Sequence, residues 1–123
     1  MIDTSVLIGT ATPGDLEGAI SVASLAELHF GVLVAKDPDE RARRSQRLGV
    51  IEATFDPLPV DAPVAREWGR LAAAVTDRGG KSRRRAMDLV IAATANVHGV
   101  ALLTADTADL AIIRDLVDVR ASA

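Results

Sequence analysis

The stretch AMDLVIAATANVHGVALLTAD, residues 86–106, contains the pattern that decides the fold. Its first part predicts a helix over residues 85–98, because apolar residues recur at helical spacing and Gly99 supplies a C-terminal stop. The next four residues, Val100–Leu103, predict a buried strand. An acid, Asp106, follows that strand closely and is expected, with Thr107, to start a short helix. The stretch therefore predicts helix, tight turn, strand and acid, which is a repeating unit of a parallel α/β sheet.

The rest of the chain alternates in the same way. Short apolar runs predict further strands at residues 19–23, 57–60 and 116–119. Helices are expected from Ser24 to about residue 35, from about residue 38 to 52, and from an Asp61 cap to the Gly79-Gly80 pair. We therefore expect one α/β domain over residues 1–123, built as a three-layer α/β/α sandwich around a mostly parallel sheet.

The composition narrows the class of protein. Of the 123 residues, 49% are hydrophobic and 25% charged, which predicts a globular chain. The absence of cysteine excludes disulfides, zinc thiolate sites and thiol catalysis. No apolar stretch reaches membrane-spanning length, and no basic and apolar leader precedes Asp3, so we expect no membrane contact and a cytoplasmic protein.

Basic residues gather in two stretches although the net charge is −3. One stretch holds Arg78, Lys81, Arg83, Arg84 and Arg85. The other holds Arg41, Arg43, Arg44 and Arg47. Such runs are either solvated faces or phosphate contacts beside an acidic centre, and composition alone leaves both interpretations open.

Four acids stand at a junction between an apolar run and an expected helix start: Asp3, Glu27, Asp88 and Asp106. An acid among apolar residues loses hydration on folding, which is costly unless a cation or hydrogen-bond donors replace the water. Three of the four follow an expected strand, and in parallel sheets such positions meet at one edge. Asp88 instead lies near the start of a helix and shares its face with core residues. The four acids together predict a single acidic site.

Each acid also has a purely structural interpretation. Asp3 and Asp106 can be helix N-caps, and Ser24 with Glu27 forms a capping box by sequence. Asp88 suits the positive end of a helix dipole. Capping needs no cluster, however, and serine, threonine or asparagine would serve equally well. An acid at all four positions therefore favours the acidic site.

Four motifs carry a resemblance that covers essentially the whole chain: DTS at residues 3–5, SxxSxxEL at 21–28, DLVIAATA at 88–95 and LTxD at 103–106. In this order and spacing they resemble the PIN-domain family, and within it the VapC-type toxins of bacterial toxin–antitoxin pairs. The resemblance implies a magnesium- or manganese-dependent endoribonuclease that acts on RNA. It implies that the metal-binding and catalytic acids are Asp3, Glu27, Asp88 and Asp106.

The resemblance also implies partners. A VapB-like antitoxin is expected to bind and silence the chain, in a groove formed by Glu27–Val34 and the helix that bears Trp68. A homodimer is expected as well.

The chain departs from the family pattern in three places. Only two residues precede Asp3, where the family has a longer apolar strand. Arg83–Arg85 stand where many members carry a further acid, which shifts the expected charge balance toward substrate binding. Asp109 stands close to Asp106 and is the less favoured candidate for the fourth acid.

The chemistry of the acids fits this interpretation. Clustered carboxylates without histidine or cysteine partners are hard oxygen ligands, which suit Mg²⁺ or Mn²⁺. A metal held there lowers the pKa of a bound water and neutralises a phosphodiester, so we expect in-line attack on phosphorus. Glu27 is expected either to bind the metal or to orient the water. The hydroxyls of Thr4, Ser5 and Thr104 are expected to hold metal-bound waters or a phosphate oxygen, or only to satisfy backbone groups at turns.

Two functions of other classes compete with the nuclease. A receiver-like magnesium-binding phosphotransfer module also places acids at strand ends, but it needs paired acids after the first strand and a late lysine, and no lysine follows Lys81. A non-catalytic nucleic-acid or protein binding domain would use the acids as caps and the basic runs as its surface. That alternative predicts indifference to divalent metal.

Overall fold

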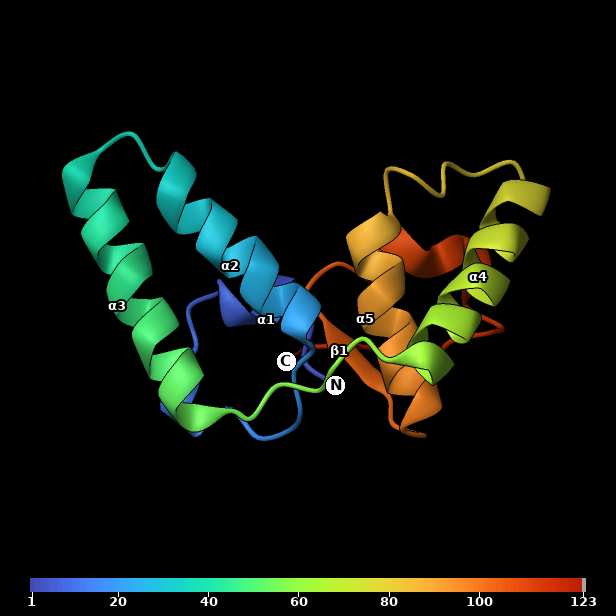
Figure 1. Cartoon of the computed structure of the whole chain (residues 1–123), viewed down its shortest axis with the longest axis horizontal. Coiled ribbons are helices and arrows are strands. Elements are labelled where there is room, and N and C mark those ends of the chain that lie inside the picture. The colour runs from blue at the N-terminus through green and yellow to red at the C-terminus, as the bar shows by residue number, and fades with distance from the viewer. Residues whose placement is uncertain (123) are drawn as a thin grey trace.

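The computed structural model describes residues 1–122. Its elements follow in the order α1 (Thr4–Leu7), η1 (Pro13–Asp15), α2 (Val22–Val34), α3 (Pro38–Thr54), α4 (Ala62–Asp77), α5 (Ala86–Val97), β1 (Leu102–Thr104), η2 (Thr107–Ile113) and β2 (Val119–Ala121). Figure 1 shows α2 and α3 on one side, α4 and α5 on the other, and β1 between them. No helix within the described residues is long and apolar enough to span a membrane.

The sheet is parallel, but its strands are short. β1 pairs with β2 in parallel, and Ile2 forms a parallel bridge with Leu103 of β1. The amide of Ile2 also donates to the carbonyl of Ala19 at 2.8 Å. Farther along, Ser21 forms a parallel bridge with Leu58. The chain thus lays five extended segments side by side, in the order residue 58, residues 19–21, Ile2, β1 and β2.

All four of the strands expected above differ in extent, and the one expected over residues 100–103 lies at Leu102–Thr104. The strand expected over 19–23 is only an isolated bridge, because α2 already begins at Val22. The strand expected over 57–60 is likewise a single bridge, which is consistent with its two prolines lacking an amide to donate. The last strand lies at Val119–Ala121 and not at 116–119.

Separate apolar clusters cover the two faces of this sheet. Met1 and Leu102 belong to a cluster built with α4 and α5. Their neighbours Ile2 and Leu103 pack into a second cluster, built with α1, α2 and α3. Because successive residues of a strand point to opposite faces, helices cover both sides of the sheet. The expected parallel sheet between two helical layers is confirmed.

The helices α4 and α5 follow the predicted pattern closely. Val64, Leu71 and Val75 are buried on the predicted face of α4. Trp68 on the same face is half-buried, and its indole Nε1 donates to the carbonyl of Ala86 at 3.1 Å. Residues 91–95 of α5 are all fully buried, so α5 is fixed in the core and its first turn is held in place.

The start of α2 differs from the prediction. The helix begins at Val22, and its N-cap is the fully buried Ser21, whose Oγ accepts the amide two residues on at 3.0 Å. The capping box predicted from Ser24 and Glu27 is therefore wrong, since both lie inside the helix. The carboxylate of Glu27 accepts a hydrogen bond from the hydroxyl of Thr4 at 2.7 Å instead. The earlier start leaves Glu27 facing the N-terminal segment.

This assignment of the N-cap predicts the order of two serine substitutions. Ser21→Ala should lower the free energy of unfolding by about 1–2 kcal/mol, because a buried amide loses its only side-chain acceptor. Ser24→Ala should cost less than about 1 kcal/mol, because Thr4 keeps its bond to Glu27. Urea unfolding followed by circular dichroism measures both. A larger loss for Ser24→Ala would contradict the assigned cap.

Candidate active site

Asp3 is fixed by both backbone and side chain. Its amide donates to the carbonyl of Leu103 at 2.9 Å, which ties it to β1. Its Oδ2 accepts the hydroxyl of Ser5 at 2.5 Å and the hydroxyl of Thr104 at 3.0 Å, and the amide of Ser5 at 3.3 Å. Within the described residues its Oδ1 accepts no hydrogen bond. Asp3 is thus the N-cap of α1 and still presents one unused carboxylate oxygen.

Asp106 has the same arrangement at the other end of the chain. It is the N-cap of η2, and its Oδ1 accepts the amide of Ala108 at 3.1 Å. Its own amide donates to the hydroxyl of the buried Thr104 at 3.2 Å. Thr104 therefore links Asp3 and Asp106 directly. The cap interpretation of these two acids is correct, and it does not compete with a shared site, because capping occupies only one oxygen of each.

Glu27 reaches the site from α2. Its half-buried side chain is held by the hydroxyl of Thr4, which also lies 3.0 Å from the Oγ of the buried Ser24. Thr4 directly follows Asp3, so the N-terminal segment positions both acids. The hydroxyls of Thr4, Ser5 and Thr104 thus hold carboxylates in place, a role that the sequence had not suggested.

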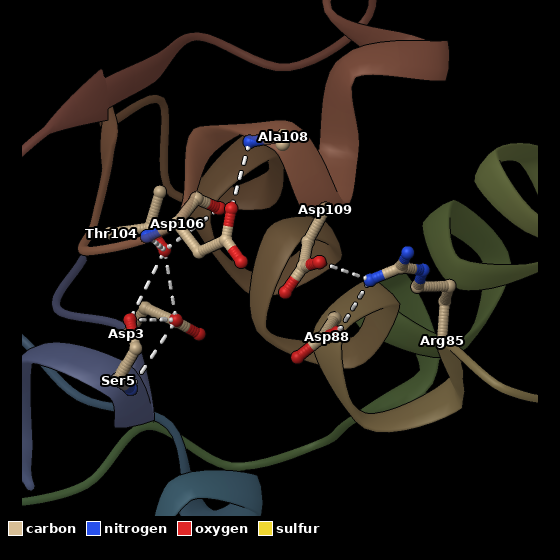
Figure 2. Close-up of polar contacts among 8 residues, drawn as sticks. All are labelled: Asp3, Ser5, Arg85, Asp88, Thr104, Asp106, Ala108 and Asp109. Carbon is tan, nitrogen blue, oxygen red and sulfur yellow. Dashed lines mark hydrogen bonds and ion pairs between the residues drawn. The ribbon is translucent and has the colours of Figure 1, made fainter.

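Asp88 lies in the first turn of α5 and is half-buried. Burial raises the pKa of its carboxyl from 3.8 to about 6, and repulsion from Asp3, Glu27 and Asp109 adds to the rise. Arg85 lowers this pKa in part. Figure 2 shows the carboxylates of Asp88, Asp3, Asp106 and Asp109 facing the same space. Asp3, Asp88 and Asp106 therefore face one space, and Glu27 of α2 is near enough to Asp88 to contribute to its raised pKa.

Arg85 and Asp109 form a contact that the sequence did not predict. Arg85 Nη1 lies 2.6 Å from Asp109 Oδ1 and 4.0 Å from Asp88 Oδ2. The contact with Asp88 spans three residues of helix and was open to prediction. The stronger contact joins residues 24 positions apart, and no sequence pattern signals it. Because Arg85 engages Asp109, Asp106 is the better candidate for the fourth acid.

The donor set fits a hard divalent ion. All of its charged donors are carboxylates, as Mg²⁺ and Mn²⁺ prefer. Within residues 1–122 no three acids or histidines are already drawn together as a metal site. Carboxylate side chains would therefore have to rotate toward the shared space to close on an ion.

A cavity of about 540 Å³ adjoins the acidic site at Thr4 and Glu27. It lies between α2 and α3, and its lining combines apolar groups such as Leu28 and Leu48 with arginines of α3. The segment expected to form a partner groove, Glu27–Val34, contributes to this cavity. The opposite wall of the cavity is α3, while α4, the helix that bears Trp68, lies across the sheet (Figure 1).

The raised pKa of Asp88 predicts how the stability of the metal-free protein depends on pH. The unfolded chain loses this proton near pH 4 and the folded chain near pH 6, so stability falls as the pH rises from about 4 to 6 and then levels off. The side chain is 33% exposed, which limits the effect to on the order of 1–2 kcal/mol. Asp88→Asn should remove the effect and stabilise the protein at pH 7.5.

Thermal unfolding in EDTA at pH 5 and pH 7.5 measures this difference, with the exposed Asp118→Asn as control. If Asp88→Asn lowers the melting temperature at pH 7.5, the carboxylate is not under electrostatic strain and the argument fails.

Comparisons with known proteins agree with this geometry. The PIN domain family model matches residues 1–115. Ribonuclease VapC4 of Mycobacterium tuberculosis (strain ATCC 25618 / H37Rv) is 39% identical over a match that covers 94% of this chain and 92% of the relative. Ribonuclease VapC5 of the same strain is 39% identical over 86% of this chain and 82% of its own length.

Solved structures support the same assignment. VapBC-5 of Mycobacterium tuberculosis, a member of the VapBC family of toxin–antitoxin systems, superimposes with a TM-score of 0.81 at 34% identity, over 98% of this chain and 94% of the other. FitAcB from Neisseria gonorrhoeae shares the fold, with a TM-score of 0.72 at 24% identity over 96% and 94% of the two chains. From the family match, the relatives and the converging acids, we conclude that the chain belongs to the PIN-domain family.

Proposed function

We propose that this chain is a divalent-metal-dependent endoribonuclease and the toxin of a toxin–antitoxin pair. The observation that carries the proposal is the position of Asp88. It is a half-buried carboxylate that faces Asp3 and Glu27, and it is poorly compensated by the one arginine near it. Two relatives that are 39% identical to the chain bear the name ribonuclease. The solved structure of VapBC-5, which is 34% identical, is that of a toxin–antitoxin system.

The three aspartates Asp3, Asp88 and Asp106 are the proposed metal ligands. Asp3 and Asp106 each keep one oxygen without a hydrogen bond in the described part of the chain, and these oxygens are available to an ion. Glu27 is proposed to bind the metal or to orient the attacking water, because its Oε1 is already held by Thr4. Mg²⁺ or Mn²⁺ is the ion that these oxygen donors favour.

The metal would supply a bound water of lowered pKa and would neutralise charge on the phosphodiester. The chain's own residues supply the geometry. Ser5 and Thr104 hold the carboxylate of Asp3 by two hydroxyl bonds, which restricts its rotation. Burial of Thr104 keeps this support rigid. Burial and neighbouring acids destabilise the charged form of Asp88, so a bound cation would stabilise this carboxylate.

The antitoxin is proposed to bind along α2 and the cavity beside it. Phe30 and Leu33 of α2 are 66% and 75% exposed, which is unusual for such large apolar side chains and marks an interaction face. The cavity of about 540 Å³ between α2 and α3 continues from this helix to Glu27. A partner seated there would reach the acidic site. A homodimer is also proposed, on the family relationship alone.

Metal-dependent cleavage of RNA tests the proposal. Antitoxin-free protein incubated with a pool of structured cellular RNAs should produce discrete cuts with Mg²⁺ or Mn²⁺ and none with EDTA. Asp88→Asn should lower the cleavage rate at least about 100-fold, because a metal ligand is lost. Asp118→Asn is the matched control, since it removes an equal charge from an exposed side chain whose only partner among residues 1–122 is Arg120.

Metal binding is followed in parallel by the rise in melting temperature on adding Mn²⁺. Loss of both cleavage and this rise in Asp88→Asn would support the nuclease. Cuts that persist in EDTA, or that Asp88→Asn leaves unchanged, would refute it. Metal binding by a folded protein that cuts no RNA would favour the non-catalytic binding domain.

A further inference from the structure

The two basic stretches of the chain differ in what their side chains contact. In α3, every arginine of the stretch donates to a partner within the molecule. Arg43 and Arg44 both pair with Glu40, at 2.6 and 2.9 Å. Arg41 donates to the carbonyl of Ala35 at 2.7 Å. Further bonds to main-chain carbonyls are Arg44 to Gly31, and Arg47 to Leu7 and Ala11. Arg41, Arg44 and Arg47 therefore hold α3 against α1, α2 and the segment between them.

In the basic stretch between α4 and α5, only some of the side chains form ion pairs with described residues. Arg78 pairs with Asp115 at 2.6 Å, and Arg85 pairs with Asp109. Between them, the side chains of Lys81, Arg83 and Arg84 make no hydrogen bond or ion pair with any described residue, and all three are exposed. We refer to residues 81–84 as the basic turn.

The basic turn lies beside the acidic site. Consecutive Cα atoms are about 3.8 Å apart, so Arg83 and Arg84 start within about 8 Å of the Cα of Arg85. The guanidinium of Arg85 in turn contacts Asp109 and approaches Asp88. Figure 2 shows Arg85 at the margin of the space that the carboxylates face. Arg83 and Arg84 therefore directly precede the arginine that contacts the acids, and both are exposed.

Three adjacent cations without partners repel one another and contribute nothing to folding through pairing. Lys81, Arg83 and Arg84 pair with none of the nearby acids in the described structure, whereas their neighbour Arg85 pairs with Asp109. The arrangement suits a ligand that carries its own repeated negative charges. A nucleic acid backbone has this property, and arginine binds phosphate oxygens with two parallel hydrogen bonds.

We propose that the basic turn binds RNA phosphates that flank the bond to be cut, while Arg85 stays paired with Asp109. This inference rests on the proposed function and names the surface that positions its substrate. RNA is favoured over a protein partner here, because the two most exposed large apolar side chains, Leu33 and Phe30, lie on α2 and not beside the basic turn.

The test compares RNA binding by the intact chain and by Arg83→Ser/Arg84→Ser. The probe is a fluorescently labelled 20-nucleotide single-stranded RNA of mixed sequence, followed by anisotropy in EDTA, where metal-dependent cleavage does not occur. Kd is measured from about 50 to 300 mM NaCl. The control is Arg66→Ser, since Arg66 is also exposed and its side chain makes no hydrogen bond or ion pair with the described residues. It lies beside Asn96 and Val97, at the far end of α5.

The double variant should bind about tenfold more weakly at 150 mM NaCl, and the slope of log K against log salt should fall by about 1.4, or 0.7 for each lost phosphate contact. Arg66→Ser should remain within about twofold of the intact chain. The melting temperature should not change in either variant, because neither removes a contact. With metal present, the double variant should raise KM more than it lowers kcat.

The experiment distinguishes failure of the proposed RNA-binding surface from failure of the proposed nuclease activity. Weaker RNA binding by the double variant supports the basic turn even if the intact chain cuts no RNA. An unchanged Kd and salt slope would overturn it even if cleavage is metal-dependent. The inference would also be overturned if Arg66→Ser weakened RNA binding as much as the double variant does. It would be overturned as well if the double variant lost antitoxin binding but kept its affinity for RNA.

Discussion

The carboxylate of Asp88 is half-buried among other acids, and the remaining features of the site can be understood as responses to that strain. Asp3 and Glu27 repel it, and burial weakens its hydration, so its pKa rises to about 6. The protein offsets the charge only partly, because Arg85 sits 4.0 Å from Asp88 and closer to Asp109. A fold that brings acids together and leaves them undercompensated is stable only at a cost, which binding of a cation would relieve.

Helix capping and the acidic site are built from the same side chains. Asp3 caps α1 and Asp106 caps η2, and each cap fixes one oxygen by a backbone amide. Thr104 and Ser5 add hydroxyl bonds at the same point, so the two ends of the chain are joined across β1. The local rules that start helices thereby determine where the carboxylates point. This dual use explains why an acid occupies positions at which serine or threonine would be sufficient for capping.

Local patterns in the sequence predicted much of this arrangement. The features that depend on contacts between distant parts of the chain could not be predicted. Helix α5, its glycine stop and the strand after it follow from residues 86–106, because periodicity and caps act over a few residues. The start of α2 was misplaced by one turn, since Ser21 and Ser24 are equally good caps and tertiary burial decides between them. The pairing of Arg85 with Asp109 and the partners of the α3 arginines depend on three-dimensional proximity, which composition and spacing do not contain. That Asp3, Asp88 and Asp106 face one space was predictable, but the hydroxyls that orient Asp3 were not.

We infer that the shared space is a metal site, and anomalous diffraction from crystals soaked in Mn²⁺ would locate an ion there. We expect a peak between Asp3, Asp88 and Asp106, with carboxylate oxygens about 2.0–2.5 Å from it. Asp109 should remain paired with Arg85. A fully soaked crystal with no peak in this space, or with the ion held by Asp109 in place of Asp106, would contradict the proposed ligand set.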